Sequence, residues 1–159
     1  MPARKINTSE SKNALRMWLR LLRCESMIEQ HIRSKLRENF STTLPQFDVL
    51  AELDYENKPM SMSDLSTKLM VSNGNITGVV DRLTRDGHVE RVTDSGDRRV
   101  QLVSLSQAGR KEFRKMASAH EAWLAELFED IDKDSISMIT GLLSDASDKL
   151  KAKTGATES

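Results

Sequence analysis

Side chains suited to reading nucleic acid lie in the middle of the chain. Over 72–85, Ile76, Val79, Val80 and Leu83 recur with helical spacing, which predicts one buried helix face. The other face then carries small, amide, acidic and basic groups: Asn73, Asn75, Thr77, Gly78, Asp81, Arg82 and Arg85. Amides can pair with adenine, and guanidinium groups with guanine, in a major groove. We therefore predict that this helix recognises base edges.

Two glycines, Gly74 and Gly78, fall within this short helix. Each costs about 1 kcal/mol of helix stability relative to alanine. Their presence needs a reason, and close approach of the helix to the groove floor is one.

A charged hairpin is predicted after this helix. His88–Thr93 and Val100–Leu105 read as two strands around a tip that carries Arg98 and Arg99. A surface loop can hold arginines without any purpose, but in a wing they would reach a narrow minor groove or the flanking phosphates. Asp97 is near enough to hold an arginine by a charge-assisted hydrogen bond.

The elements that position these groups begin at Ser61. Ser61 and Asp64 form a capping-box pattern, and Leu65 and Leu69 follow at helical spacing. Ser72 is placed to cap the second helix. Two short helices and a hairpin predict a winged helix-turn-helix.

Longer helices are expected on both sides of this part. A helical pattern runs over 11–39, and another begins near Thr43–Gln46 and is acidic, so it should face away from DNA. After the hairpin, Ser106 should cap a helix whose apolar row continues to Ile131, and a last row covers 136–150. The fold class expected is mainly α with a small β-hairpin. The tail from residue 151 is polar, and we expect it to be disordered.

Composition limits the function classes. The 159 residues carry a net charge of zero and one cysteine, which excludes an internal disulfide. The segment 57–105 holds seven Lys and Arg against six Asp and Glu, so partners must be inferred from where charge lies. No catalytic, cofactor or metal-ligand motif is present, and we expect no enzyme. Met1–Lys5 lacks an apolar targeting segment and no membrane span is predicted, so a cytoplasmic protein is expected.

The same residues carry a resemblance to a known family. The segments are Asp64–Ser66, Asn75–Thr77, Val80–Leu83, Gly87–Arg91, Asp97–Arg99 and Leu102–Gly109. Together they resemble the MarR family of bacterial transcriptional regulators, and the wing pattern of Asp97 and Arg99 is the most specific part.

The resemblance implies a single MarR-like domain over 1–159. Its winged-helix part would cover 43–105, and 11–39 and 106–153 would be dimerisation helices. A homodimer would bind a pseudo-palindromic operator in double-stranded DNA, usually as a repressor. The residues expected to contact DNA are Ser61, Ser72, Asn73, Asn75, Thr77, Arg82, Arg85, Asp97, Arg98 and Arg99.

Arginines on the first helix admit two interpretations. Arg16, Arg20 and Arg23 fall on one side, either as an ordinary solvated face or as part of a pocket for an anion. The segments 43–48 and 70–78 resemble a branch that controls aromatic-acid catabolism. That branch implies an aromatic acid or its CoA thioester as the small-molecule effector. The residues expected to bind it are Arg16, Trp18, Arg20, Leu22, Arg23 and Phe47.

Two further alternatives concern regulation. Cys24 is interpreted mainly as buried filler, with a redox-sensing thiol as the alternative. A winged helix that binds protein without an effector response is the other, although such a module needs neither an arginine-tipped wing nor an amide-lined helix.

Overall fold

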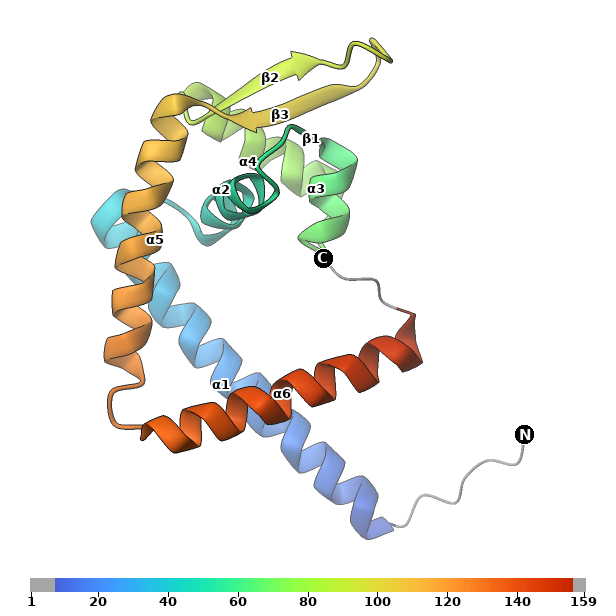
Figure 1. The fold of residues 1–159 in the computed structure, drawn as a ribbon, viewed down its shortest axis with the longest axis vertical. Helices are drawn as coiled ribbons and strands as arrows, with labels where there is room; N and C mark the ends of the chain where they lie inside the picture. The colour runs from blue at the N-terminus through green and yellow to red at the C-terminus, as the bar shows by residue number, and fades with distance from the viewer. Residues whose placement is uncertain (1–7, 156–159) are drawn as a thin grey trace, which may run out of the picture. The chain divides into compact units, whose positions relative to one another are not determined.

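The computed structural model describes residues 8–155 as mostly helix with one small sheet (Figure 1). The predicted fold class is confirmed. By internal contacts the chain divides into two compact units, 1–44 and 45–159, which are described separately. The elements are α1 (Thr8–Phe40), α2 (Leu44–Glu56), β1 (Met60–Ser61), α3 (Met62–Lys68), α4 (Asn73–Arg85), β2 (Val89–Thr93), β3 (Gln101–Leu105), α5 (Gln107–Leu127) and α6 (Lys133–Thr154).

The first unit is built on α1, which is slightly longer than the predicted 11–39. Ile32 and Leu36 are buried, whereas every residue over 8–27 is exposed in the single chain. The interpretation of Cys24 as buried filler is wrong for this chain, because the thiol lies in that exposed half of the helix. The helix ends where Ser41 takes a positive φ of 52°.

The second unit has its core beneath α4. Ile76, Val80 and Leu83 are at most 2% exposed, which confirms the predicted buried face, and Val79 is half-buried. Residues from the neighbouring elements that complete this core are Val49, Leu50, Leu53, Met60, Leu65, Val89, Val103, Phe113 and Met116. Burial of such side chains contributes about 1.5–3 kcal/mol each relative to exposure. The apolar stripe therefore fixes which face of α4 stays outside.

The sheet has three strands in the order β1-β3-β2, all antiparallel, whereas the sequence predicted only the hairpin. β1 is only two residues long and pairs Met60 with Val103, which is distant in sequence. A strand this short has no alternating apolar and polar pattern by which it could be predicted. The predicted strand starts at His88 and Val100 each fall one residue early. His88 instead accepts a backbone hydrogen bond from Ser106 at 3.0 Å.

Two predictions about the last third are wrong in detail. α5 ends at Leu127 rather than reaching Ile131, because Asp132 caps a new helix by accepting the Ser135 N–H at 2.9 Å. The polar segment 151–154, expected to be disordered, continues α6. The remainder of that tail, 156–159, and the segment Met1–Lys5 lie outside the described residues.

The start of α5 is fixed directly to the chain that follows α4. Ser106 Oγ donates to the Gly87 carbonyl at 2.6 Å and accepts the Gly109 N–H at 2.9 Å, which confirms Ser106 as the cap. A Cβ at Gly109 would lie 1.8 Å from the His88 carbonyl oxygen. Only glycine fits at this contact between the helix and the backbone.

Gly109→Ala should therefore lower the free energy of unfolding by about 2 kcal/mol or more, since backbone on both sides would have to move. Gly78→Ala is the matched control, because no atom lies within 4 Å of its Cβ position. It should raise stability by up to about 1 kcal/mol through helix propensity. Urea unfolding of both variants measures the difference, and equal effects would contradict the contact.

Candidate nucleic-acid interface

The turn between α3 and α4 is held by its own hydrogen bonds. Ser66 Oγ donates to the Val71 carbonyl at 2.6 Å, and the Val71 N–H donates to the Ser66 carbonyl at 3.1 Å. Met70 adopts a φ of +54° between them. Ser72 then caps α4 by accepting the Asn75 N–H at 3.3 Å, as predicted.

The outward face of α4 is the predicted polar face. Asn73, Asn75, Thr77, Arg82 and Arg85 are all exposed, and the space above both glycines of the helix is empty. The Thr77 hydroxyl donates to the Asn73 carbonyl at 2.8 Å, so its donor is used within the helix. Arg82 Nε lies 3.3 Å from the Asp86 carboxylate. Asn73, Asn75 and Arg85 are therefore the exposed side chains of this face for which no such hydrogen bond or ion pair is seen within the described residues.

The tip of the wing carries two exposed arginines. The Arg99 side chain is 92% exposed, yet the residue is anchored, because Asp97 Oδ1 accepts its backbone N–H at 3.0 Å and its Nε–H at 3.3 Å. The predicted bond from Asp97 is confirmed. The side-chain bond uses only Nε of the guanidinium, so Nη1 and Nη2 make no contact with Asp97. The second arginine, Arg98, is exposed beside it.

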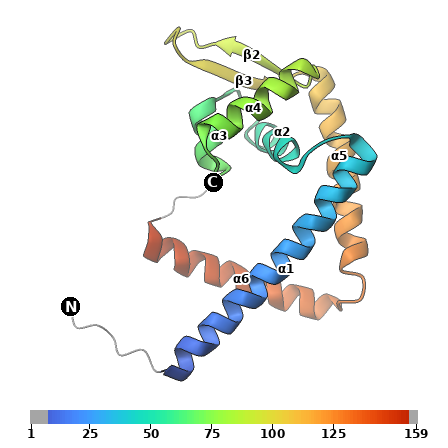
Figure 2. The same cartoon turned by 180° about the vertical axis from the view of Figure 1, so that it is seen from behind.

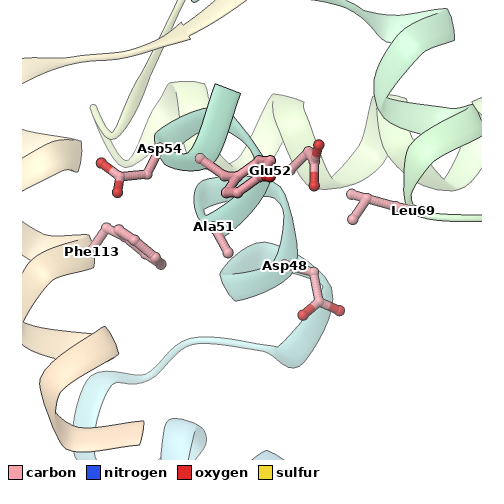
Figure 3. A pocket seen from close by; sticks show the side chains of 7 residues that line it. Asp48, Ala51, Glu52, Asp54, Leu69 and Phe113 are labelled. Atoms are coloured by element: carbon pink, nitrogen blue, oxygen red, sulfur yellow. The ribbon is translucent and has the colours of Figure 1, made fainter. Parts of the chain in front are cut away.

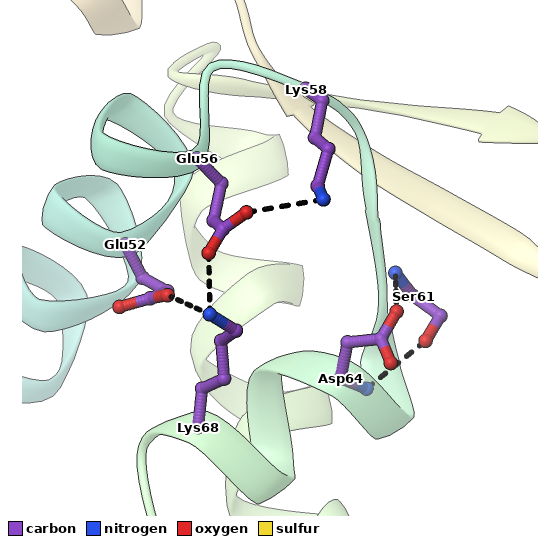
Figure 4. Close-up of polar contacts among 6 residues, drawn as sticks. All are labelled: Glu52, Glu56, Lys58, Ser61, Asp64 and Lys68. Carbon is purple, nitrogen blue, oxygen red and sulfur yellow. Dashed lines mark hydrogen bonds and ion pairs between the residues drawn. The ribbon is translucent and has the colours of Figure 1, made fainter. Parts of the chain in front are cut away.

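A cluster of ion pairs fastens α3 to α2 (Figure 4). The ammonium of Lys68 contacts Glu56 and lies 3.4 Å from Glu52, and Lys58 lies 3.2 Å from Glu56. The sequence reading missed this cluster, although opposite charges on neighbouring short helices were a usable signal. Lys68 and Lys58 hold the pKa of Glu56 below its usual value, chiefly by hydrogen bonding, and Glu56 raises the pKa of Lys68.

The start of α3 carries the predicted capping box. Ser61 Oγ accepts the Asp64 N–H at 3.0 Å, and Asp64 accepts the Ser61 N–H at 3.4 Å (Figure 4). The acceptor side of Ser61, a candidate DNA contact, is thus occupied by the cap. Its hydroxyl hydrogen can still be donated.

An ion pair joins the wing to α4. Arg91 on β2 donates to the Asp81 carboxylate on α4, and the two elements lie one above the other in Figure 2. Asp81 was placed on the outer face by the sequence reading, but its partner was not predicted. Ten residues and a turn separate the two, so helical periodicity could not reveal the contact.

A hollow of about 530 Å³ lies beside α2 (Figure 3). It is lined by Asp48, Ala51, Glu52, Asp54, Tyr55, Leu69 and Phe113. The acidic character predicted for this helix is seen in its wall, although Glu52 is paired with Lys68 and Asp54 with Arg110 at 3.2 Å. A wall of carboxylates does not suit an anionic ligand.

The residues expected to bind an effector belong to different units. Arg16, Trp18, Arg20, Leu22 and Arg23 are exposed on α1. Phe47 belongs to the second unit, is 7% exposed, and packs with its ring centroid 5.6 Å from that of Phe113 and 5.0 Å from that of His120. Burial lowers the pKa of His120. Phe47 is thus a core residue of its own unit, and the exposed group on α1 is the part that offers charge.

Within residues 8–155, no helix is long and apolar enough to cross a membrane. The same residues contain no group of three or more His, Cys, Asp or Glu side chains placed to hold a metal ion.

Comparison with known proteins places these features in context. A model described as "MarR family" matches residues 42–101. The chain is 33% identical over 135 residues to the transcriptional activatory protein BadR of Rhodopseudomonas palustris, covering 82% of this chain and 77% of BadR.

Two solved structures share the fold. A MarR family transcriptional regulator from Silicibacter pomeroyi superposes with a TM-score of 0.78 at 27% identity, covering 91% of this chain and 99% of that one. FabT of Streptococcus pneumoniae, in complex with DNA, gives a TM-score of 0.72 at 21% identity, with 89% and 99% covered. At that identity FabT supports the fold alone.

The ion pairs of Glu56 predict a response to acid. Its folded pKa lies below the ordinary 4.5, so the stability it contributes is complete above pH 4.5 and is lost as the pH falls through the lowered value. The urea midpoint of the wild type should therefore fall more steeply below pH 4.5 than that of Glu56→Gln. Glu90→Gln, an exposed carboxylate on β2, should keep the wild-type slope. Parallel curves for wild type and Glu56→Gln would show that the cluster adds nothing.

Proposed function

Because this chain belongs to the MarR family of transcriptional regulators, we propose that it binds operator DNA as a homodimer and responds to a small anionic effector. One observation carries the DNA-binding part. The amide-bearing and arginine-bearing face of α4 is exposed beside a wing whose tip presents Arg99. These are the side chains that read base edges and enter a minor groove.

In the proposed complex each subunit places α4 in a major groove. Half-sites would then lie about 34 Å apart, one turn of duplex, so the operator should be close to a palindrome. Asn73 and Asn75 are proposed to contact bases, and Arg82 and Arg85 bases or phosphates. Ser61 and Ser72 would donate their hydroxyl hydrogens to phosphates while their oxygens accept the capping N–H groups.

The wing is proposed to act in the flanking minor groove. Arg99 would insert there, with Asp97 holding its backbone and Nε and with Arg98 beside it on a phosphate. A narrow A/T-rich groove concentrates negative potential, so this contact depends on groove width rather than on hydrogen bonds to particular bases. The fold is compatible with a duplex, since FabT has been solved in complex with DNA.

For dimerisation we propose the residues 11–39 and 106–153. In the described chain these helices expose Leu15, Trp18, Ile139 and Leu143, a large apolar area for a lone subunit. The winged-helix part, 43–105, would then be carried by the dimer. Repression is the commoner outcome in this family, while the relative BadR is named as an activator, so activation is the second candidate.

For the effector we propose an aromatic acid or its CoA thioester. Arg16, Arg20 and Arg23 are exposed at spacings of four and three along α1, and Trp18 and Leu22 lie exposed among them. Guanidinium groups bind carboxylates and phosphates, and the apolar side chains would meet an aryl or acyl group. Such a ligand can change DNA affinity only by binding two arrangements of the dimer unequally.

The exposed thiol of Cys24 supports a second regulatory candidate. In the single chain an oxidant can reach it, and its oxidation would change the segment 11–39 that is proposed for dimerisation. A sensing thiol must react faster than a free model thiol. Alkylation kinetics of the full chain would decide, and an ordinary rate would end this candidate.

Replacing Arg99 tests the wing. Arg99→Ala should weaken binding to operator DNA with A/T-rich flanks by about 1–3 kcal/mol and should weaken binding to G/C-rich flanks less. Arg114→Ala, an exposed arginine on α5, is the matched control and should leave the flank preference unchanged. Gel-shift titrations at several salt concentrations make the measurement. Unchanged affinity of Arg99→Ala throughout would refute the minor-groove role.

Titration with candidate effectors tests the ligand class. Operator DNA should be released, or its complex altered, by benzoate, hydroxycinnamates or their CoA esters, observed by fluorescence anisotropy of labelled DNA. Arg16→Ala with Arg20→Ala should raise the concentration needed, because an anion would lose two partners. Lys149→Ala on α6 is the control. If no compound changes DNA binding, the aromatic-acid proposal fails while the DNA-binding proposal stands.

A further inference from the structure

The buried part of the wing hairpin ends at the paired residues Arg91 and Val103. Along β2, Val89 is buried, Arg91 is half-buried, and Val92 and Thr93 are exposed. Arg91 pairs in the ladder with Val103, which is fully buried. Beyond this position no described residue of the hairpin is buried, so apolar packing alone does not fix the direction of the outer part.

The contact at that position is polar and spans two DNA-facing elements. Arg91, with its side chain 28% exposed, donates to Asp81 on α4, whose side chain is 49% exposed. The contact is made by Nη2, whereas Nε of Arg91 is buried and has no hydrogen-bond partner among the described residues. Asp81 is thus the residue that holds the Arg91 guanidinium in place.

A shallow hollow adjoins the pair on its solvent side. Asp81, Thr84, Arg85 and Arg91 line a hollow of about 430 Å³ between α4 and the wing. The ion pair lies at the edge of this hollow and is the side-chain contact that joins β2 to α4 there.

We propose that Asp81 and Arg91 are a positioning pair that sets the angle of the wing against α4, and with it the position of the wing tip relative to its groove. This inference rests on the proposed function as an operator-binding protein. Asp81 itself need not touch DNA. Its carboxylate lies on an otherwise basic and amide face of α4, and its role there is to orient Arg91.

The closing experiment uses full-length protein and DNA recovered by the wild type from a random-sequence pool. Affinities are measured on the recovered sequence with A/T-rich and with G/C-rich flanks, and their ratio is the flank discrimination. Asp81→Asn and Arg91→Gln should each lower this ratio by about threefold, the size expected for one partly exposed ion pair. The double variant should lose no more than either single variant.

Two controls separate positioning from charge and from folding. Glu90→Gln removes one negative charge, as Asp81→Asn does, but from β2, the strand that carries Arg91. It should leave the flank discrimination unchanged. The swapped variant Asp81→Arg with Arg91→Asp should recover the discrimination, which neither a lost DNA contact nor general destabilisation would allow. Amide relaxation of the tip, 94–100, without DNA should show greater motion in Asp81→Asn than in Glu90→Gln.

The outcomes are distinguishable. If the wild type recovers no DNA, the proposed function fails and the pair fails with it. If the wild type binds and Asp81→Asn keeps the full flank discrimination, or if the two single losses simply add, the positioning pair is refuted while the DNA-binding function stands.

Discussion

Burial of one stripe of α4 is the constraint on which the second unit depends. Ile76, Val80 and Leu83 can leave water only by facing the core, and this orients every other side chain of the helix outward. The Ser72 cap fixes where α4 begins, the ion pairs of Lys68 hold α3 to α2, and Gly109 fixes the start of α5 against the chain that follows α4. The face of α4 that is proposed to read DNA is therefore set by core packing, because it consists of the side chains that the core leaves exposed.

Much of this arrangement could be predicted from local sequence. Helical periodicity located α3 and α4, and the three serine caps at Ser61, Ser72 and Ser106 were all recognisable from side-chain chemistry within three residues. The bond from Asp97 to Arg99 was predictable for the same reason. Local rules work where a contact closes within a turn of chain, because few alternative partners compete over that distance.

The features that were missed depend on partners far along the chain. β1 exists only because β3 lies beside it, and the pairs of Lys68 with Glu56 and of Arg91 with Asp81 need the tertiary fold first. The end of α5 was predicted too late because the apolar row continues to Ile131, although α5 ends at Leu127 and Asp132 caps the next helix. Exposure of Cys24 was missed because apolar neighbours along a helix indicate burial only when something covers them. The predicted domain limits and site residues stay predictions.

Met70 shows the energetic cost of the turn between α3 and α4. A side chain at φ +54° is less favourable than glycine by about 1–2 kcal/mol, and Met70 gains little in return from burial, being 80% exposed. Glycine would relieve the strain but would also widen the range of conformations open to the unfolded and folded turn. The turn between α3 and α4 is therefore restrained by its stereochemistry, because a residue with a Cβ has fewer accessible backbone conformations than glycine.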